Sequence, residues 1–154
     1  MLKELEAIVR RAGELVREAH DVERVTSEKT GAADLVTKYD IAVQGFLKRE
    51  LLALLPEGDH AALTRPWTFI VDPIDGTTNF VRGIAFTNIS VALALDGQVE
   101  YAVIYAPLLD ELFSAQRGCG AFCNGLPIHV STRDMNHAVF LCGSTIYDRS
   151  LTDR

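Results

Sequence analysis

The feature that most constrains the fold of this chain is a change in apolar periodicity near residue 67. Before it, apolar side chains recur every three to four residues, which predicts amphipathic helices. After it, short β-branched and aromatic runs alternate with glycine-containing turns, which predicts strands. Helices followed by many antiparallel strands, with no internal repeat, indicate an α+β or layered α/β domain.

Two helices are predicted, at residues 2–19 and 37–55. The first has one apolar stripe with charged side chains on the opposite face. The second begins at Thr37, whose hydroxyl can cap the helix while Asp40 completes a capping box, and it ends before a proline. Between the helices, residues 21–33 are polar and predict a loop or a short irregular hairpin.

The second part of the chain predicts a series of short strands. Two dipeptides, Asp96-Gly97 and Asn124-Gly125, are typical of two-residue hairpin turns. Few residues follow the last strand, so we expect sheet faces that remain uncovered. The predicted strands cover residues 67–71, 89–95, 99–105, 112–116, 121–123, 127–130 and 138–142.

The composition narrows the class of protein. The 154 residues, 48% hydrophobic and 23% charged, fit one globular domain or one domain and part of a second. A net charge of −6 argues against a nucleic-acid partner bound through phosphate neutralisation. The uncharged stretch at residues 84–95 is shorter than the roughly 20 residues that span a membrane. Acidic residues near the start argue against a secretory signal, so we expect a cytoplasmic protein with no membrane partner.

There are three cysteines, Cys119, Cys123 and Cys142, and such a small, odd number argues against a disulfide framework. Their spacing is not that of a Cys-x-x-Cys site, and the four histidines are scattered. We interpret the cysteines as buried reduced thiols, and zinc is not indicated.

The candidate chemistry lies in residues 72–80, which follow a predicted buried strand. Pro73 is expected to end that strand and to direct Asp72 and Asp75 into one small volume. Two carboxylates that close repel each other unless a cation lies between them. Their hard oxygen atoms favour magnesium, manganese or calcium over softer metals.

The residues that follow add groups suited to phosphate. Gly76 allows a ligand to approach the backbone, and residues 77–80 can begin a helix whose N–H groups bind phosphate. Enzymes that hydrolyse phosphate esters need carboxylates that bind metal ions next to hydrogen-bond donors that bind the phosphate. The alternative is an ordinary turn, because Asp-Pro and Asp-Gly are common turn dipeptides. Asp96-Gly97 has no second acid or threonine pair beside it, and we interpret it as such a turn.

The motif Asp72-Pro73-Ile74-Asp75-Gly76-Thr77-Thr78-Asn79-Phe80 resembles the first signature of the inositol monophosphatase family. Other stretches resemble the family's upstream segment and its strand-turn-strand region, in the family's order, so that the resemblance covers most of the chain. These stretches are Lys29, residues 34–37, Asp40, residues 118–125 and residues 130–131.

The resemblance implies an αβαβα layered fold and a magnesium-dependent, lithium-sensitive phosphomonoesterase that forms a homodimer. Its substrate would be myo-inositol monophosphate, attacked directly by metal-activated water with two or three Mg²⁺ ions bound and no covalent intermediate. Related phosphatases that act on a nucleotide 3′-phosphate, a fructose bisphosphate or histidinol phosphate stay open. So does a weakened regulatory or binding relative.

The resemblance also implies roles for single residues. Asp72 and Asp75 would bind metal through their carboxylates, and Ile74 through its backbone carbonyl. Ile74, Asp75, Gly76 and Thr77 would contact the substrate, with the Gly76 and Thr77 N–H groups on its phosphate. Asp75 and the Thr77 hydroxyl would act in catalysis, the hydroxyl by orienting and activating the attacking water.

The resemblance implies two further catalytic candidates. Lys29 would lie near the mouth of the site, and Asp40 would lie behind the metal ligands. For both, a purely structural role is the alternative: Lys29 as a solvated lysine and Asp40 as part of a helix cap.

The chain also departs from the family pattern. The family's Gly-Glu-Glu motif is absent between residues 56 and 66, and the chain stops at Arg154 before the Trp-Asp motif of the second signature. We therefore expect residues 1–154 to form the N-terminal α+β part of an inositol monophosphatase-like domain. A chain of this length alone is expected to be unstable and nearly inactive, and turnover by a verified 154-residue polypeptide would contradict that.

Overall fold

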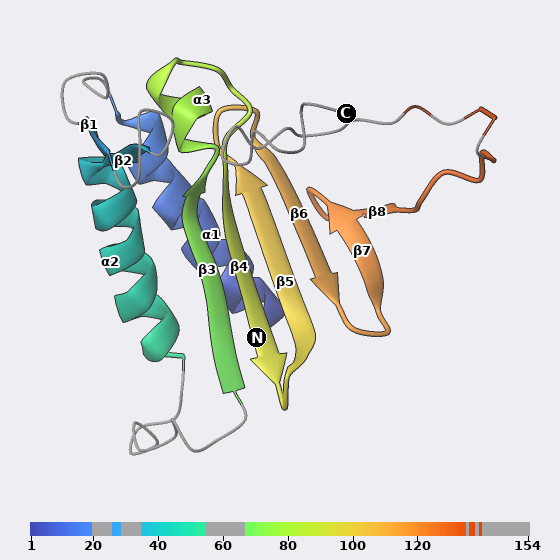
Figure 1. Ribbon diagram of the computed structural model, residues 1–154. Helices are drawn as coiled ribbons and strands as arrows, with labels where there is room; N and C mark the ends of the chain where they lie inside the picture. The colour runs from blue at the N-terminus through green and yellow to red at the C-terminus, as the bar shows by residue number, and fades with distance from the viewer. Residues whose placement is uncertain (20–25, 29–34, 55–66, 135, 138, 140–154) are drawn as a thin grey trace, which may run out of the picture.

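A computed structural model describes residues 1–19, 26–28, 35–54, 67–134, 136–137 and 139. Helices precede most of the strands, as the change in periodicity predicts (Figure 1). In chain order the elements are α1 (Leu2–Arg17), β1 (Thr26–Glu28), β2 (Leu35–Thr37), α2 (Lys38–Leu52), β3 (Trp67–Asp75), α3 (Thr77–Val81), β4 (Asn88–Leu95), β5 (Gln98–Ala106), β6 (Glu111–Gln116), β7 (Gly120–Cys123) and β8 (Leu126–Ile128).

Strands β3 to β8 form a six-stranded antiparallel sheet in which each strand pairs with the next along the chain. Both predicted hairpin turns are confirmed. Asp96 and Gly97 have φ of 52° and 76°, and Asn124 and Gly125 have φ of 49° and 79°, the left-handed values that a two-residue turn requires. Strands β1 and β2 pair in antiparallel fashion, as in the predicted hairpin, although β2 lies beyond the predicted range of residues 21–33.

Helices α1 and α2 pack against each other and against one face of the large sheet. In Figure 1, α1 lies behind β4 and β5, and α2 runs beside β3. The predicted stripe of α1 is buried here, with Leu5 and Val9 fully inaccessible. Burial of apolar surface is the main favourable term in folding, so this layer is the core of the described structure. It also contains Val43, Leu47, Ile89, Leu93, Val103 and Tyr105.

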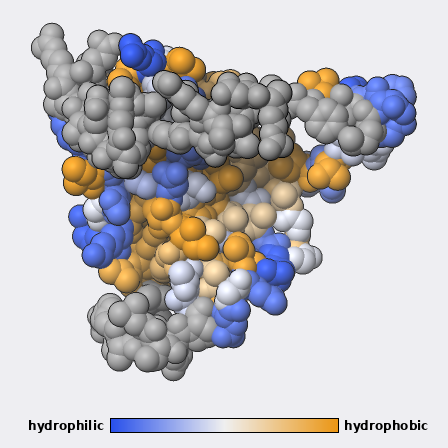
Figure 2. Space-filling view, viewed as in Figure 1, coloured by the Kyte–Doolittle hydropathy of each residue, from blue (hydrophilic) through white to orange (hydrophobic). Residues whose placement is uncertain are grey.

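The opposite face of the sheet carries a row of small apolar side chains. Residues paired directly across strands share a face. The row therefore includes Ile70, Ala92, Ala102, Ala115, Ala121 and Ile128, one from each strand. Ile70 is 55% exposed, and Figure 2 shows apolar surface over the middle of this face. The described helices pack on the other face, so within the described residues this face has the exposed apolar surface that was expected.

Several boundaries differ from the predictions. Helix α1 ends at Arg17, and α2 begins at Lys38 because Thr37 is the last residue of β2. Strand β8 ends at Ile128 rather than at residue 130. The predicted strand at 138–142 lies outside the described residues except for Val139, which belongs to no strand.

The cysteine prediction is partly wrong. Cys119 is exposed because it lies in the turn before β7, and Cys123 is half-buried; both are free thiols. Cys142 lies outside the described residues. No helix in the described part of the chain is long and apolar enough to cross a membrane.

Candidate functional site

A β-bulge shapes the end of β3. Strands β3 and β4 pair regularly as far as Asp72 and Ser90 and pair again at Asp75 and Asn88. Between these pairs β3 has one more residue than β4, so one residue of β3 is left over. The prediction that Pro73 ends the strand is wrong, because a bulge accommodates a residue that has no N–H to donate.

The bulge brings two carboxylates to one face of the sheet. Asn88 and Ser90 are two residues apart, so their side chains point the same way. Asp75 and Asp72 lie directly opposite them and therefore share that face. In a regular strand, residues three apart would point to opposite faces. Both aspartates are exposed, so the pair faces solvent at the end of β3 where α3 begins (Figure 1).

The residue after this pair is held in a conformation that favours glycine. Gly76 has φ of 82° and immediately precedes α3. A Cβ atom built on it would lie 3.0 Å from the backbone oxygen of Phe86. The neighbour at this position is the protein's own loop, so the approach of a ligand to the Gly76 backbone stays a prediction.

Thr77 links three elements of the fold. Its Oγ1 lies 3.0 Å from the Ile74 carbonyl oxygen and 3.3 Å from Asp40 Oδ1. A hydroxyl has one proton, so it donates to one of these acceptors at a time. Asp40 lies in the first turn of α2 and is 8% exposed. The structure thus brings Asp40 of α2 together with Ile74 and Thr77, although Asp40 lies far from the other two in the sequence.

The sequence prediction missed three side chains that contact this turn. Asn88 Nδ2 donates to Asp75 Oδ2 at 3.1 Å, and Thr87 Oγ1 donates to the Asp75 carbonyl at 2.9 Å. Asn79 Nδ2 donates to the Phe86 carbonyl at 2.7 Å. Asn79 lies in the motif already singled out, where it was given no role of its own. The signal for Thr87 and Asn88 was a polar Thr-Asn pair directly before an otherwise apolar run.

Other predicted site residues cannot be placed. Lys29 and residues 56–66, where the Gly-Glu-Glu motif is absent, lie outside the described residues. Among the described residues, no three His, Cys, Asp or Glu side chains are grouped closely enough to hold a metal ion. The donor set described here is therefore two carboxylates with a nearby backbone carbonyl.

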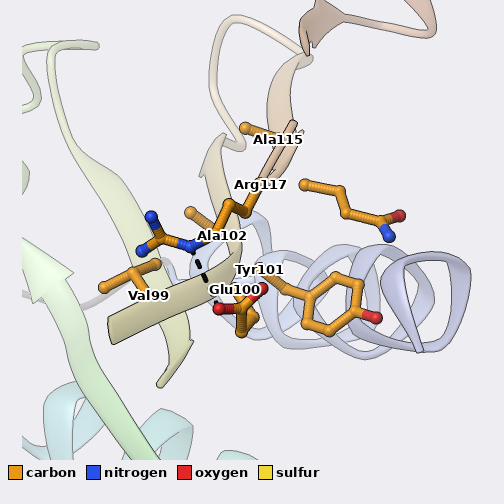
Figure 3. A pocket seen from close by; sticks show the side chains of 7 residues that line it. Val99, Glu100, Tyr101, Ala102, Ala115 and Arg117 are labelled. Carbon is orange, nitrogen blue, oxygen red and sulfur yellow. Dashed lines mark hydrogen bonds and ion pairs between the residues drawn. The ribbon is translucent and has the colours of Figure 1, made fainter. Parts of the chain in front are cut away.

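A shallow depression lies at the other end of the sheet. It measures about 240 Å³ and is lined by residues of β5 and β6, including Tyr101 and Ala115 (Figure 3). An ion pair between Glu100 and Arg117, at 3.0 Å, crosses it. Because β5 begins where β4 ends, the depression is remote from Asp75 and takes no part in the candidate site.

A second polar cluster joins α1 to the β5–β6 turn. Arg17 donates to the Tyr105 hydroxyl and, at 3.0 Å, to Asp110 Oδ1, and the Tyr105 hydroxyl donates to the same oxygen at 2.8 Å. The hydrogen bond from Tyr105, and then the Arg17 guanidinium, hold the pKa of Asp110 below its ordinary value. Burial, and then the bond to Asp110, raise the pKa of Tyr105. This cluster ties helix to sheet and lies apart from the aspartate pair.

Solved structures share this fold. The extragenic suppressor protein suhB from Bartonella henselae superimposes with a TM-score of 0.75 at 36% identity, covering 85% of this chain and 54% of that one. An IMPase from Thermotoga maritima gives a TM-score of 0.73 at 34% identity, with the same coverage of 85% and 54%. These similarities confirm the predicted fold.

Curated relatives agree with the solved structures. Inositol monophosphatase 1 of Bos taurus is 37% identical over 80% of this chain and 48% of its own length. Inositol monophosphatase 3 of Solanum lycopersicum is 40% identical over 80% of this chain and 50% of its own length. The chain spans about half the length of these relatives. A model of the inositol monophosphatase family matches residues 1–152, and the chain belongs to that family.

Proposed function

We propose that the protein hydrolyses phosphate monoesters and that its substrate is myo-inositol monophosphate, released as inositol and phosphate. The observation that carries this proposal is the β3 bulge, which puts the Asp72 and Asp75 carboxylates on one face directly before Gly76. Family membership supports the choice of an inositol phosphate among phosphate esters.

The donor set fits a hard divalent cation. The Asp72 and Asp75 carboxylates and the Ile74 carbonyl are oxygen ligands of the kind that Mg²⁺ prefers. Mg²⁺ held by one or two carboxylates usually keeps several waters, so a small protein donor set is compatible with it. When bound, two or three Mg²⁺ ions would make a water more acidic and offset the charge that develops on the leaving oxygen.

The residues after Asp75 would bind and orient the reacting groups. The N–H groups of Gly76 and Thr77 would hold the phosphate, because backbone dipoles fixed in place need no reorganisation during the reaction. The Thr77 hydroxyl, which lies within reach of Asp40, would accept a hydrogen bond from the attacking water while donating to that carboxylate. Lys29, which the family resemblance places near the mouth of the site, would attract the anionic substrate.

The reaction would be a single displacement. The water oxygen bonds to phosphorus as the bond from phosphorus to the inositol oxygen breaks, and the water's proton passes towards the Thr77 and Asp40 pair. The leaving oxygen would take up a proton from a solvent water and depart as the inositol hydroxyl. No bond forms between the protein and phosphorus.

The test is phosphate release by the full-length protein with Mg²⁺ and four substrates: inositol 1-phosphate, adenosine 3′,5′-bisphosphate, fructose 1,6-bisphosphate and histidinol phosphate. We expect the highest kcat/KM with inositol 1-phosphate. Indifference to inositol 1-phosphate with turnover of another substrate would identify a different phosphatase of this superfamily. No turnover and no Mg²⁺ binding would favour a regulatory relative.

Three further properties belong to the same proposal: inhibition by lithium and assembly as a homodimer, which rest on family membership, and location in the cytoplasm. Lithium chloride titration of phosphate release and light scattering after size exclusion test the first two. Fractionation of source cells tests the third. Activity unaffected by lithium, a monomeric mass, or recovery outside the cytosolic fraction would contradict the corresponding statement.

A further inference from the structure

Three side-chain hydrogen bonds tie the start of β4 to the turn at the end of β3. Asn79 donates to the Phe86 carbonyl, Thr87 to the Asp75 carbonyl, and Asn88 to the Asp75 carboxylate. We call Asn79, Thr87 and Asn88 the β4 brace. Two of these bonds join Thr87 and Asn88 to Asp75, and the third joins Asn79 of α3 to Phe86, so together they fix the turn and α3 against the start of β4.

The brace holds Asp75 at its backbone through a buried contact. Thr87 is 2% exposed, and its hydroxyl is 2.9 Å from the Asp75 carbonyl oxygen. A buried hydroxyl is costly unless it is hydrogen-bonded, so this contact is strongly favoured in the folded protein. The main chain of Asp75 therefore has little freedom to move away from β4.

The brace also holds Asp75 at its side chain. Asn88 is its direct partner in the strand register, and directly opposed side chains leave the sheet about 5 Å apart on the same face. The Asn88 amide occupies Oδ2 of Asp75 at 3.1 Å. Oδ1 accepts no hydrogen bond from the part of the chain that the structure describes. With Oδ2 fixed, Oδ1 is presented in one direction.

The chemistry of the amide suits this task. An asparagine side chain donates a hydrogen bond without carrying charge. A lysine or arginine at position 88 would orient the carboxylate equally well but would also neutralise it and repel a cation. An amide leaves the full negative charge of Asp75 to attract a metal.

We propose that Asn88 is a positioning residue that presents Oδ1 of Asp75 to a divalent cation, with Thr87 and Asn79 holding the backbone for it. This inference rests on the proposed function, because it assigns a role towards the metal of that site. Partners that orient metal ligands usually matter to affinity almost as much as the ligands themselves.

The experiment compares Asn88→Leu, which keeps the side-chain size without a donor, with Asn88→Ser, a milder change that fits the strand. Asn136→Ala is the control, because this exposed asparagine has no side-chain hydrogen bond to Asp72 or Asp75 in the described part of the chain. For each full-length variant, Mg²⁺ affinity is measured by calorimetry without substrate, and the Mg²⁺ midpoint, kcat and KM by phosphate release. Thermal unfolding without Mg²⁺ reports the fold.

We expect Asn88→Leu to weaken Mg²⁺ binding roughly 10-fold, within the range seen for such partners. Saturating Mg²⁺ should restore most of kcat and leave KM for the substrate unchanged. A purely structural role would instead lower the unfolding temperature and reduce kcat at every Mg²⁺ concentration. Folded Asn88 variants with the Mg²⁺ affinity of the wild type would overturn the inference while the proposed function stands. A wild type that neither binds Mg²⁺ nor releases phosphate would overturn both.

Discussion

Two Asp-Gly dipeptides lie at opposite ends of β4, and the same two residues serve different purposes. At Asp96-Gly97 both residues have positive φ, and a Cβ on Gly97 would meet nothing within 4 Å. At Asp75-Gly76 only the glycine has positive φ, and its Cβ would lie 3.0 Å from the Phe86 backbone oxygen. The first dipeptide closes a hairpin in open solvent. The second is packed against a neighbouring loop.

The difference teaches that the dipeptide itself does not make a site. Both pairs turn the chain, which is the ordinary use of Asp-Gly. What distinguishes Asp75 is its surroundings: Asp72 on the same face across the bulge, Asn88 on its carboxylate, and Thr77 beside the buried Asp40. Matched substitutions at the two turns therefore separate the candidate chemistry from turn formation.

The largest loss of activity is expected when the carboxylate charge is removed from Asp75, whereas the same change at Asp96 should have no effect. Asp75→Asn should lower kcat/KM for inositol 1-phosphate by at least about 100-fold, since even partners of metal ligands matter by 10- to 100-fold. Asp96→Asn should leave activity unchanged, because asparagine readily adopts the turn conformation. Steady-state phosphate release measures both, and equal activity of the two variants would remove the distinction between the turns.

A smaller loss is expected at the Thr77 hydroxyl, beside the Asp75-Gly76 turn. Thr77→Ala should reduce kcat about 100-fold, the lower end of what a positioned proton-transfer group contributes. Thr77→Ser keeps the hydroxyl near Asp40 and Ile74 and should recover most of that loss. If serine proves as inactive as alanine, the methyl group matters and the hydroxyl does not.

The two glycines give a comparison of stability. Gly97→Ala introduces only the strain of a side chain at positive φ, about 1 kcal/mol in the free energy of unfolding, with normal activity. Gly76→Ala adds the close contact with Phe86, so we expect a loss of about 2 kcal/mol and reduced activity. Urea unfolding monitored by circular dichroism measures both. Equal destabilisation of the two variants would mean that the loop at Phe86 moves to accommodate the added methyl group without cost.

The smallest effect is expected away from both turns, at Asp110. Its pKa lies below the ordinary value because of Tyr105 and then Arg17, so its contacts stabilise the folded state when it is charged. That stability is present above the unfolded-state pKa, about 4, and is lost as the pH falls through the lower folded-state pKa. Asp110→Asn should therefore unfold at a lower temperature than the wild type at pH 7, with a smaller difference near pH 3.

Asparagine suits the positive φ of 52° at position 110, so backbone strain should not obscure this comparison. Phosphate release at pH 7 should be unchanged, because Tyr105 pairs with Ile89 and so lies on the other face of the sheet from Asp75, whose partner is Asn88. A melting difference that stays the same at both pH values would show that the carboxylate charge contributes nothing there.

Local features of the sequence predicted the helices and the hairpin turns well. The apolar stripe of α1 and the Asp96-Gly97 turn depend on neighbours in the chain, and both are present in the structure. The bulge at Pro73 was not predictable in this way, because it depends on how β3 pairs with β4. Asn88 was missed for the same reason: its contact with Asp75 exists only once the strand register is known.

The contact between Asp40 and Thr77 shows the same limit. Each residue was singled out separately, Asp40 from a capping pattern and family resemblance and Thr77 from the motif. Only the packing of α2 against β3 brings them to 3.3 Å. Sequence patterns thus identify residues capable of chemistry, while non-local pairing decides which of them meet.

The most direct test is calorimetric titration of Mg²⁺ into the full-length wild type, Asp75→Asn and Asp96→Asn. We expect the wild type and Asp96→Asn to bind with the same affinity and Asp75→Asn to bind at least 10-fold more weakly, as expected for loss of a metal ligand. Identical titrations for all three proteins, whether they bind or not, would mean that the Asp75-Gly76 segment is a turn like the other and not a metal site.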